Sequence, residues 1–397
     1  MKISNRLNSI KPSMTLAIDA KAKELKAQGV DVIGFGTGEP DFPTPDNIKE
    51  AAIKAIQNNQ TKYPPVPGTD ELKNAIIQKF QKENGVTYNS DQILVSTGAK
   101  QSFYNLAQAL WEPGDEIIIP SPYWVSYPDM VLLSGATPKI VDTTISNGFK
   151  LTPDQLNEAV SKNTKAIVIN SPSNPTGSAY NKKELEALVE CALKNNLLII
   201  SDEIYERIVF DGFEQVSVAS LGEEVKKNSV IINGVSKAFS MTGWRIGYIA
   251  AEPEIVKSVK KLQGQITSGA CSISQAAAAE ALTGPQDYIP ERVQEFQKRR
   301  DFVLNNLESI NGVKCFKPAG TFYCFPDFSG IFGASFNGKK IEDSLTLGEF
   351  LLEEAKVALV PGSAFGAKAN MRFSYATSTE ILEKGLSRIK NAFEKIN

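Results

Sequence analysis

Short apolar runs alternate with helical patterns through the middle of the chain, and no other feature of the sequence constrains the fold as strongly. We expect strands in six of these runs, at residues 93–95, 116–119, 166–169, 197–200, 229–232 and 247–250. The runs are apolar at successive positions, which indicates that both faces of the sheet are covered. Helical patterns separate several of the runs, among them 101–110 and 183–194. This alternation predicts a largely parallel α/β sheet.

The C-terminal third has longer charged helices and shorter strands, which indicate a second, smaller α+β domain. Helical patterns lie at 290–308, 345–355 and 380–395, and short strands are expected at 322–325 and 371–374. A further helical pattern at 15–28 precedes the first strand. We therefore expect a large domain at 46–290 and a small domain at 291–397. The N-terminal segment at 1–45 precedes the sheet and could join either domain; we assign it to the small domain.

Histidine is absent from all 397 residues, and this excludes several classes of catalytic site. Ser-His-Asp and Cys-His hydrolysis, His-ligated zinc and the facial-triad iron site all need imidazole. Acid–base chemistry must therefore use Lys, Tyr, Asp, Glu, Cys or a cofactor. We expect no metal, because the four cysteines form no Cys-x-x-Cys pair.

Charge and hydropathy favour a cytoplasmic protein that binds neither nucleic acid nor a membrane. The net charge of −2 gives no reason to expect a nucleic-acid partner. No stretch approaches the ~18 consecutive apolar residues of a membrane span, and no apolar core of a secretory signal is visible near the N-terminus. The cysteines are expected to be buried thiols in a reducing compartment.

Polar residues gather where the expected strands end, which is the edge of a parallel sheet at which ligands bind. The first strand is followed by Gly98, Ala99 and Lys100. Small residues at the start of a helix leave backbone N–H groups free for an anion such as phosphate, although an ordinary strand–glycine–helix turn has the same sequence. Two prolines and a glycine shape the loop around Asn174. They either fix Asn174 as a hydrogen-bond donor or form a rigid turn and nothing more.

The fourth and fifth strands end in charged residues. Asp202 follows the fourth strand, where a buried carboxylate is costly unless it meets a cation or a donor; helix capping is the alternative role. Lys237 follows the fifth strand among apolar and small residues. Burial there should lower its pKa and activate it for Schiff-base formation, whereas most lysines are solvated surface residues. Arg245 lies eight residues further on and could neutralise an anion at Gly98.

These residues together match the needs of pyridoxal 5'-phosphate. The cofactor needs a lysine for its aldehyde, an acidic partner for its pyridine nitrogen and a site for its phosphate. It also withdraws electrons from carbon, which explains how a chain without histidine can move protons at a carbon atom.

The chain resembles a known family, the class I pyridoxal-phosphate aminotransferases, and in particular the shorter bacterial subgroup of aspartate aminotransferases. The motifs that carry the resemblance are KPSMT at 11–15, GEPDF at 38–42, Tyr63 with Pro67-Gly68, PYWVSYP at 122–128, NPTG at 174–177, SDEIY at 201–205, SKAF at 236–239 with GWR at 243–245, and MRFS at 371–374. The resemblance covers nearly the whole chain. It implies fold type I, with a mostly parallel seven-stranded sheet in the large domain, and a homodimer.

The resemblance implies a role for each matching residue. Lys237 is the expected catalytic residue, which would hold the cofactor and shuttle the proton at the substrate Cα. The expected cofactor-binding residues are Tyr63, Gly98, Ala99, Lys100, Trp124, Asn174, Asp202, Tyr205, Ser236, Lys237 and Arg245. The expected substrate-binding residues are Ser13, Thr15, Gly38, Lys100, Trp124, Asn174 and Arg372.

Within that set, Asp202 would pair with the pyridine nitrogen, while Tyr205 and Asn174 would hydrogen-bond to the ring hydroxyl. Tyr63 would reach the phosphate bound by the neighbouring subunit. Arg372 would clamp the α-carboxylate of the substrate with its two-pronged guanidinium. The chain departs from the common phosphate site at Gly234, where a Ser or Thr can stand three residues before the lysine.

The resemblance favours transfer of the amino group of L-aspartate to 2-oxoglutarate, which gives oxaloacetate and L-glutamate by a ping-pong path. In this subgroup Lys100 and the hydroxyls of Ser13 and Thr15 would read the second carboxylate. Prephenate is a further candidate acceptor. An aromatic or kynurenine-type aminotransferase, or a lyase, remains open on the same scaffold, and a cofactor-binding transcription regulator is the alternative outside enzymes.

Overall fold

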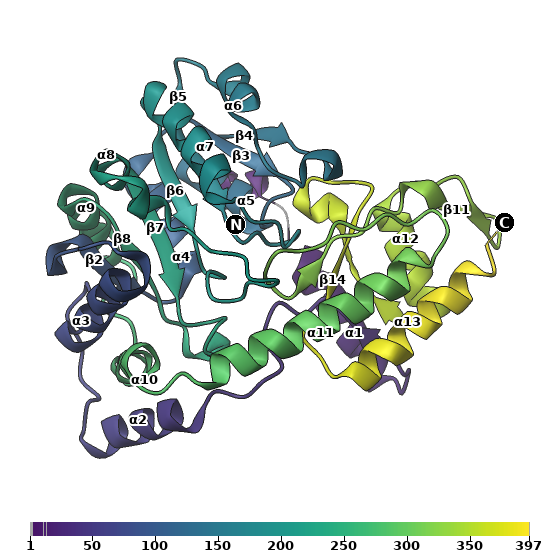
Figure 1. Cartoon of the computed structure of the whole chain (residues 1–397), viewed down its shortest axis with the longest axis horizontal. Coiled ribbons are helices and arrows are strands. Elements are labelled where there is room, and N and C mark those ends of the chain that lie inside the picture. Colours follow the sequence, from purple (N-terminus) through teal and green to yellow (C-terminus); the bar gives the residue numbers. More distant parts are fainter. Residues whose placement is uncertain (1–2, 11, 13, 397) are drawn as a thin grey trace.

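The computed structural model describes residues 3–10, 12 and 14–396, and it describes no side chain for Thr15, Leu16 and Asp19. The protein has a large lobe built on one sheet and a smaller lobe beside it (Figure 1). The long helix α11 (Tyr288–Glu308) starts next to α10 (Ser272–Thr283) and runs into the smaller lobe (Figure 1).

The large lobe contains a seven-stranded sheet with the order β2-β8-β7-β6-β5-β3-β4. Its strands are β2 (Ile93–Ser96), β3 (Glu116–Ser121), β4 (Thr137–Asp142), β5 (Thr164–Asn170), β6 (Leu198–Asp202), β7 (Ser229–Gly234) and β8 (Gly247–Ala250). Neighbouring strands are parallel except at β8, which is antiparallel to both β2 and β7. The predicted mostly parallel α/β sheet is confirmed, and the solved structures reported below have the same fold.

Helices cover both faces of the sheet, as the continuous apolar runs predict. The helices of this lobe are α2 (Asp46–Gln57), α3 (Asp70–Lys79), α4 (Ala99–Leu110), α5 (Ser126–Ser134), α6 (Pro153–Ala159), α7 (Lys182–Lys194), α8 (Glu223–Lys227), α9 (Pro253–Gln263) and α10. Ile117 and Ile119 pack with α4, α5 and α9 on one face. Ile118 lies between them and packs with α3, α7 and α10 on the other face. Successive strand residues therefore enter opposite cores, so the middle of each central strand is a run of consecutive apolar residues.

The sequence did not predict strand β4, and its composition explains why. This strand lies at the edge of the sheet, pairs with β3 alone, and has every residue at least partly exposed. It contains Pro138 and Lys139, which are tolerated at a sheet edge but break the apolar run expected of a buried strand.

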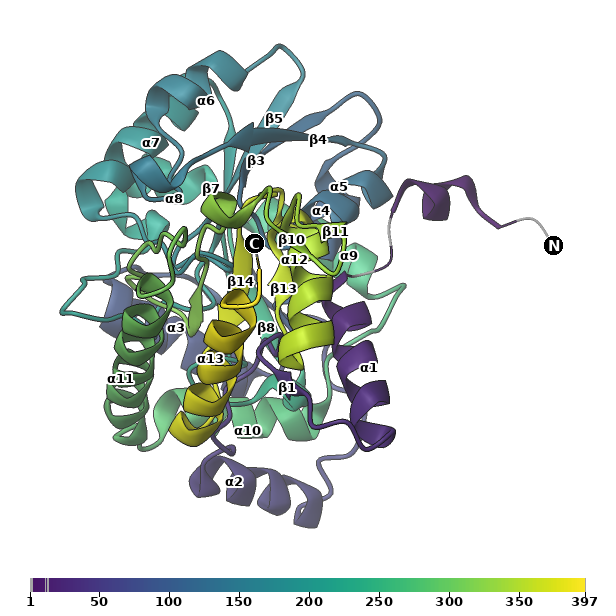
Figure 2. The same cartoon turned by 90° about the vertical axis from the view of Figure 1, so that its right-hand side faces the viewer.

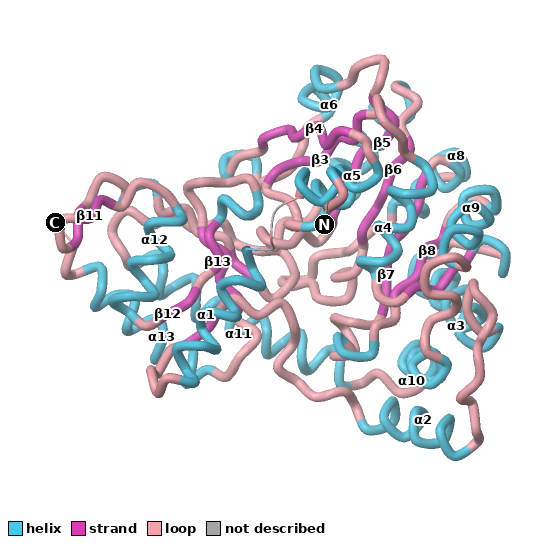
Figure 3. Tube along the Cα trace, turned by 180° about the vertical axis from the view of Figure 1, so that it is seen from behind, coloured by secondary structure: helices cyan, strands magenta, loops and turns pink. Residues whose placement is uncertain are grey.

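The smaller lobe combines segments from both ends of the chain. Its elements are α1 (Met14–Ala27), β1 (Ile33–Gly34), α11, β9 (Tyr323–Cys324), β10 (Ser335–Phe336), β11 (Lys339–Lys340), α12 (Ser344–Phe350), β12 (Val357–Ala358), β13 (Val360–Pro361), β14 (Met371–Ser374) and α13 (Thr379–Phe393). Strand β1 pairs in parallel with β12, and α1 lies beside β12 and β13 (Figures 2 and 3). The N-terminal segment thus packs with the C-terminal third, and the hydrophobic core of the lobe includes Phe35 as well as Phe373.

Candidate active site

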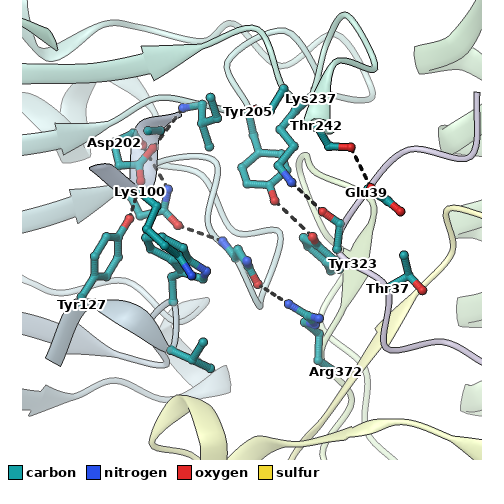
Figure 4. A pocket seen from close by; sticks show the side chains of 18 of the residues that line it. Thr37, Glu39, Lys100, Tyr127, Asp202, Tyr205, Lys237, Thr242, Tyr323 and Arg372 are labelled. Carbon is teal, nitrogen blue, oxygen red and sulfur yellow. Dashed lines mark hydrogen bonds between the residues drawn. The ribbon is translucent and has the colours of Figure 1, made fainter. Parts of the chain in front are cut away.

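A large cavity lies where the two lobes meet, at the carboxyl ends of the central strands. It has a volume of about 430 Å³, within the usual range for small-molecule sites. Its lining includes Ala99, Lys100, Trp124, Asn174, Asp202, Tyr205, Ser236, Lys237 and Arg245 from the large lobe, and Gly38 and Arg372 from the other segments. Most of the residues predicted for the site therefore share one cavity (Figure 4).

Lys237 points into this cavity from the loop after β7. Its Nζ donates a hydrogen bond to the carbonyl oxygen of Gly38 at 2.5 Å. The same atom lies 5.6 Å from the centre of the Tyr205 ring and 5.8 Å from that of Phe322. Burial, with the nearby Arg372 guanidinium adding to it, lowers the pKa of Lys237 to about 8. About a tenth of this amine is consequently neutral and nucleophilic at pH 7, far more than of an ordinary lysine.

Asp202 ends β6 and is 5% exposed. Tyr127 donates a hydrogen bond to its Oδ2 at 2.6 Å, and the backbone N–H of Ile204 donates to Oδ1 at 3.2 Å. Burial raises the pKa of Asp202, and the hydrogen bond from Tyr127 acts against that rise. Neutral donors hold this carboxylate in place, so it can still accept a cationic partner.

Asn170 joins two of the predicted residues through its side-chain amide. Its Nδ2 donates to the backbone carbonyl of Asp202 at 3.0 Å, and its Oδ1 accepts from the backbone N–H of Asn174 at 2.9 Å. Asn170 is the last residue of β5 and lines the cavity. The rule that strand ends carry the ligand site could have identified it from the sequence, whereas nothing in the sequence singled out Tyr127.

Arg372, from β14, reaches the cavity from the opposite side (Figure 4). Its guanidinium donates to Asn174 Oδ1 at 3.0 Å and to the carbonyl oxygen of Gly36 at 2.7 Å. The guanidinium carbon lies 4.5 Å from the centre of the Tyr323 ring. Among the described residues no group accepts a hydrogen bond from its buried Nε atom. The unused donor points to an acceptor that a ligand would bring.

The N-terminus of α4 forms a cradle in which Arg245 lies against Gly98. Gly98 has a φ of +84°, and a side chain there would collide with the Arg245 guanidinium. The cation therefore lies beside the start of a helix, where the first backbone N–H groups lack partners within the helix, an arrangement that suits a phosphate. Lys100 Nζ lies 5.1 Å from the centre of the Trp124 ring. Burial and the nearby Arg245 lower the pKa of Lys100.

The departure at Gly234 follows from the packing of the sheet. A Cβ atom at this position would lie 2.8 Å from the carbonyl oxygen of Ile246 and 2.9 Å from the Cα of Gly247. The close approach of β8 to β7 therefore leaves no room for a side chain. The missing hydroxyl is a steric requirement of this chain.

Among the described residues, two of those predicted for the site, Tyr63 and Gly98, are not part of the cavity lining. Tyr63 is 96% exposed and lies outside it. Ser13 and the side chain of Thr15 lie outside the described residues. Other cavity residues were not predicted, namely Gly36, Thr37, Glu39, Val125, Tyr127, Asn170, Ile204, Thr242 and Tyr323. Among these, Thr242 donates to Glu39 Oε2 at 2.7 Å and so links the segment after β1 to the loop after β7.

Residues 3–10, 12 and 14–396 contain no cluster of Cys, Asp and Glu that could hold a metal ion. Within the same ranges, no helix is both long enough and apolar enough to cross a membrane.

Comparisons with known proteins agree on one family. A family model for class I and II aminotransferases matches residues 30–389. A protein of Rickettsia felis named as a probable aspartate/prephenate aminotransferase is 51% identical over 100% of this chain and 97% of its own length. The crystal structure of the aspartate aminotransferase from Rhizobium meliloti matches over 100% of both chains, with a TM-score of 0.97 and 45% identity. That of the Thermus thermophilus enzyme with maleate covers 99% of this chain and 100% of its own, with a TM-score of 0.92 and 41% identity.

Proposed function

This chain belongs to the class I and II aminotransferases, and from that premise we propose that it transfers the amino group of L-aspartate to 2-oxoglutarate. The products are oxaloacetate and L-glutamate, formed in two half-reactions of a ping-pong cycle. The observation that carries the proposal is one cavity that holds Lys237 together with Lys100 and Arg372, apart from the Arg245 assigned to the phosphate. Two cations match the two carboxylates of a dicarboxylic substrate.

The enzyme depends on pyridoxal phosphate, as its family does. When bound, this cofactor supplies an aldehyde that condenses with amines and a ring that withdraws electrons from the substrate Cα. The cavity fits such a group. Lys237 offers an amine with a lowered pKa. Asp202 offers a buried carboxylate whose hydrogen-bond donors, among the described residues, are all neutral. The cradle at Gly98 offers an anion site beside Arg245.

The cofactor would be held at several points by residues of the large lobe. Asp202 would keep the ring nitrogen protonated, since ion pairing offsets the cost of burying the carboxylate. Tyr205 and Asn174 would hydrogen-bond to the ring hydroxyl, and Trp124 would stack on the ring. The phosphate would lie among Gly98, Ala99, Lys100, Ser236 and Arg245.

Lys237 would carry the proton in both half-reactions. As a neutral amine it would take the proton from the substrate Cα, and as an ammonium it would return that proton at C4′ of the bound cofactor. Its lowered pKa, about 8, places both protonation states within reach near neutral pH. The surrounding rings of Tyr205 and Phe322 restrict the positions that its Nζ can adopt.

Arg372 would bind the α-carboxylate. Its guanidinium is held in plane by Asn174 and by the carbonyl of Gly36, and its buried Nε is available to a ligand oxygen. Trp124, Asn174 and Gly38 would complete this end of the site. Lys100, with Ser13 and Thr15, would read the second carboxylate. The Thermus thermophilus relative was solved with maleate, which also has two carboxylates.

A homodimer would complete the site. Tyr63 is 96% exposed and lies next to a loop that also exposes Ile266, and in a dimer its hydroxyl would reach the phosphate in the neighbouring subunit. We expect Tyr63→Phe to weaken binding of pyridoxal phosphate without changing the mass of the dimer in light scattering. A monomer in that experiment would contradict the proposed role of Tyr63.

Domain boundaries at 45/46 and 290/291, and a cytoplasmic location, are part of the same proposal. The pairing of β1 with β12 supports the first boundary, and the course of α11 supports the second. The four cysteines, all of them in described parts of the chain, are unpaired, which supports a reducing compartment. Limited proteolysis and cell fractionation would test these points.

A substrate panel tests the choice of aspartate against the aromatic and kynurenine-type alternatives. We expect the highest kcat/KM with L-aspartate and L-glutamate, and lower values with phenylalanine, tyrosine and kynurenine. Prephenate is the further acceptor to include, since the Rickettsia felis relative is named for it. Lys100→Ala should reduce kcat/KM for aspartate more than for an aromatic substrate; equal losses would remove Lys100 as a specificity residue.

A further inference from the structure

A second cluster of charged groups lies buried beneath the cavity and belongs to none of the roles described so far. Lys79 forms an ion pair with Glu206, and their side chains are 1% and 9% exposed. Asn233 Nδ2 donates to Glu206 Oε1 at 2.7 Å. Nearly complete burial makes such a pair costly unless its geometry is exact and its remaining atoms are satisfied.

Glu206 connects two segments that carry residues of the active site. It follows Tyr205 directly in the chain, and its partner Asn233 precedes Gly234 near the end of β7, the strand that leads to Lys237. Asn233 Oδ1 in turn accepts from the backbone N–H of Gly234 at 2.7 Å. A single carboxylate therefore fixes the Tyr205 turn relative to the base of the Lys237 loop.

A π-helical turn places the partners of this carboxylate. Helix α3 ends at Lys79 and continues as one π turn, Phe80–Asn84. The wider turn brings Lys79 Nζ within 2.9 Å of Asn84 Oδ1, while Asn84 Nδ2 lies 3.5 Å from Glu206 Oε2. Glu83 of the same turn pairs with Arg207. Single π turns inside helices often mark functional sites.

The charges of this cluster balance locally. Burial alone would raise the pKa of Glu206, but Lys79, Arg207 and Asn233 together outweigh burial and the pKa is lowered. The other ionisable groups around Glu206 are Arg207, Glu83, Glu203 and Tyr248. Arg207 also donates to Gln286 at 2.7 Å and lies 5.0 Å from the centre of the Phe239 ring. The cluster is thus packed between α3, the 205–207 turn and the loop after Lys237.

We propose that Lys79 and Glu206 are positioning residues, which hold the Tyr205 hydroxyl at the cofactor by fixing the Tyr205 turn to the end of β7. This inference rests on the proposed function, in which Tyr205 bonds to the ring hydroxyl and Lys237 carries the cofactor. Neither Lys79 nor Glu206 lines the main cavity, so they act through Tyr205 and Lys237 alone.

The test uses the holoenzyme of Lys79→Met and of Glu206→Gln, and measures the pH midpoint of the absorption band of the lysine-bound cofactor. A weaker bond from Tyr205 to the ionised ring hydroxyl should raise this midpoint by about one pH unit in both variants. We also expect kcat to fall about tenfold with KM for aspartate nearly unchanged. Removing a positive charge and removing a negative charge would move the midpoint in opposite directions if the cluster acted only by its field.

Two controls separate positioning from general destabilisation. Lys194→Met breaks an exposed ion pair, and Val303→Ala weakens the core of the other lobe; both should leave the midpoint unchanged, although the second lowers Tm. Opposite shifts in Lys79→Met and Glu206→Gln, or a lowered Tm with an unchanged midpoint, would overturn the proposal.

If neither buried variant folds, Asn84→Ala tests the proposal instead. This variant keeps the ion pair between Lys79 and Glu206 and removes only the partly exposed side chain that accepts a hydrogen bond from Lys79. Asn84→Ala should also raise the midpoint, by less than Lys79→Met and Glu206→Gln, and an unchanged midpoint would overturn the proposal. A wild-type protein that shows no band would instead contradict the proposed function itself.

Discussion

The cofactor-facing wall of the cavity comes from one sheet, whereas the opposite wall is assembled from segments far apart in the chain. Asn170, Asp202 and the loop carrying Lys237 follow three adjacent parallel strands, β5, β6 and β7. The other wall combines the segment after β1 with Tyr323 of β9 and Arg372 of β14. The hydrogen bond from Arg372 to Asn174 joins the two walls, whereas that from Arg372 to Gly36 lies within the second wall.

Because the two walls are held together in different ways, we expect them to serve different steps of the reaction. The sheet wall is held by ladder hydrogen bonds and by two apolar cores, so its polar groups are fixed before any ligand arrives. The opposite wall depends on a few polar contacts between lobes, and such contacts can break and re-form as a ligand binds. We therefore expect substitutions in the sheet wall to affect the chemical step, and those in the opposite wall to affect substrate binding.

Lys237→Ala should have the largest effect, because it removes both the amine that binds the cofactor and the base that moves the proton. We expect kcat to fall by about 10⁴-fold or more. Steady-state assay with L-aspartate and 2-oxoglutarate measures this loss. A variant with more than a few per cent of wild-type activity would show that another group carries the proton.

Arg372→Lys sharpens the comparison from the other wall. Lysine keeps the charge but loses the two-pronged fork, so kcat/KM for aspartate should fall by about 10²- to 10³-fold, mainly through KM. Arg388→Lys, at an exposed pair with Asp31, is the matched control and should behave like the wild type. A loss confined to kcat would show that Arg372 acts in the chemical step and not in substrate binding, and would contradict the proposed difference between the two walls.

Tyr127→Phe tests how firmly the sheet wall holds Asp202. Loss of the donor at 2.6 Å should reduce kcat by about 10- to 100-fold, the usual value of a hydrogen bond to a charged group. The pKa of Asp202 should rise further, so the acid limb of the kcat profile should move to higher pH. Tyr88→Phe is the control, since no group within the described ranges bonds to that buried hydroxyl.

The smallest expected effect is a pH dependence of apo-protein stability. The pKa of Lys237 is about 8 in the folded protein and about 10 in an unfolded chain. Between these values the unfolded state binds more protons, so the stability of the wild type should rise with pH relative to Lys237→Met. Below pH 8 the difference in Tm should be constant; a constant difference up to pH 10 would contradict the lowered pKa.

The sequence predicted the sheet wall far better than the opposite wall, for a physical reason. Strand ends of a parallel sheet meet at one edge, so Asp202 and Lys237 could be brought together from their positions in the chain alone. No comparable rule places Arg372 beside Asn174, because that contact depends on how the two lobes pack. Arg372 was identified through the family resemblance, and the comparisons confirm the family.

Some features could not be predicted from local patterns at all. The apolar run at 247–250 predicts a strand, but it contains no information that β8 is antiparallel. The helix expected at 345–355 is α12 followed by a π turn, Leu351–Ala355, since helical periodicity does not distinguish the two. Tyr127 has the apolar surroundings of an ordinary core tyrosine, and only its contact with Asp202 reveals its role.

The central claim is that Lys237 and the sheet wall convert L-aspartate through pyridoxal phosphate. The most direct test is the absorbance spectrum of the purified protein loaded with pyridoxal phosphate, recorded before and after L-aspartate and again after 2-oxoglutarate. We predict a band of the lysine-bound cofactor that disappears with aspartate and returns with 2-oxoglutarate. A band that aspartate leaves unchanged would contradict the substrate, and the absence of any such band would contradict the role of Lys237.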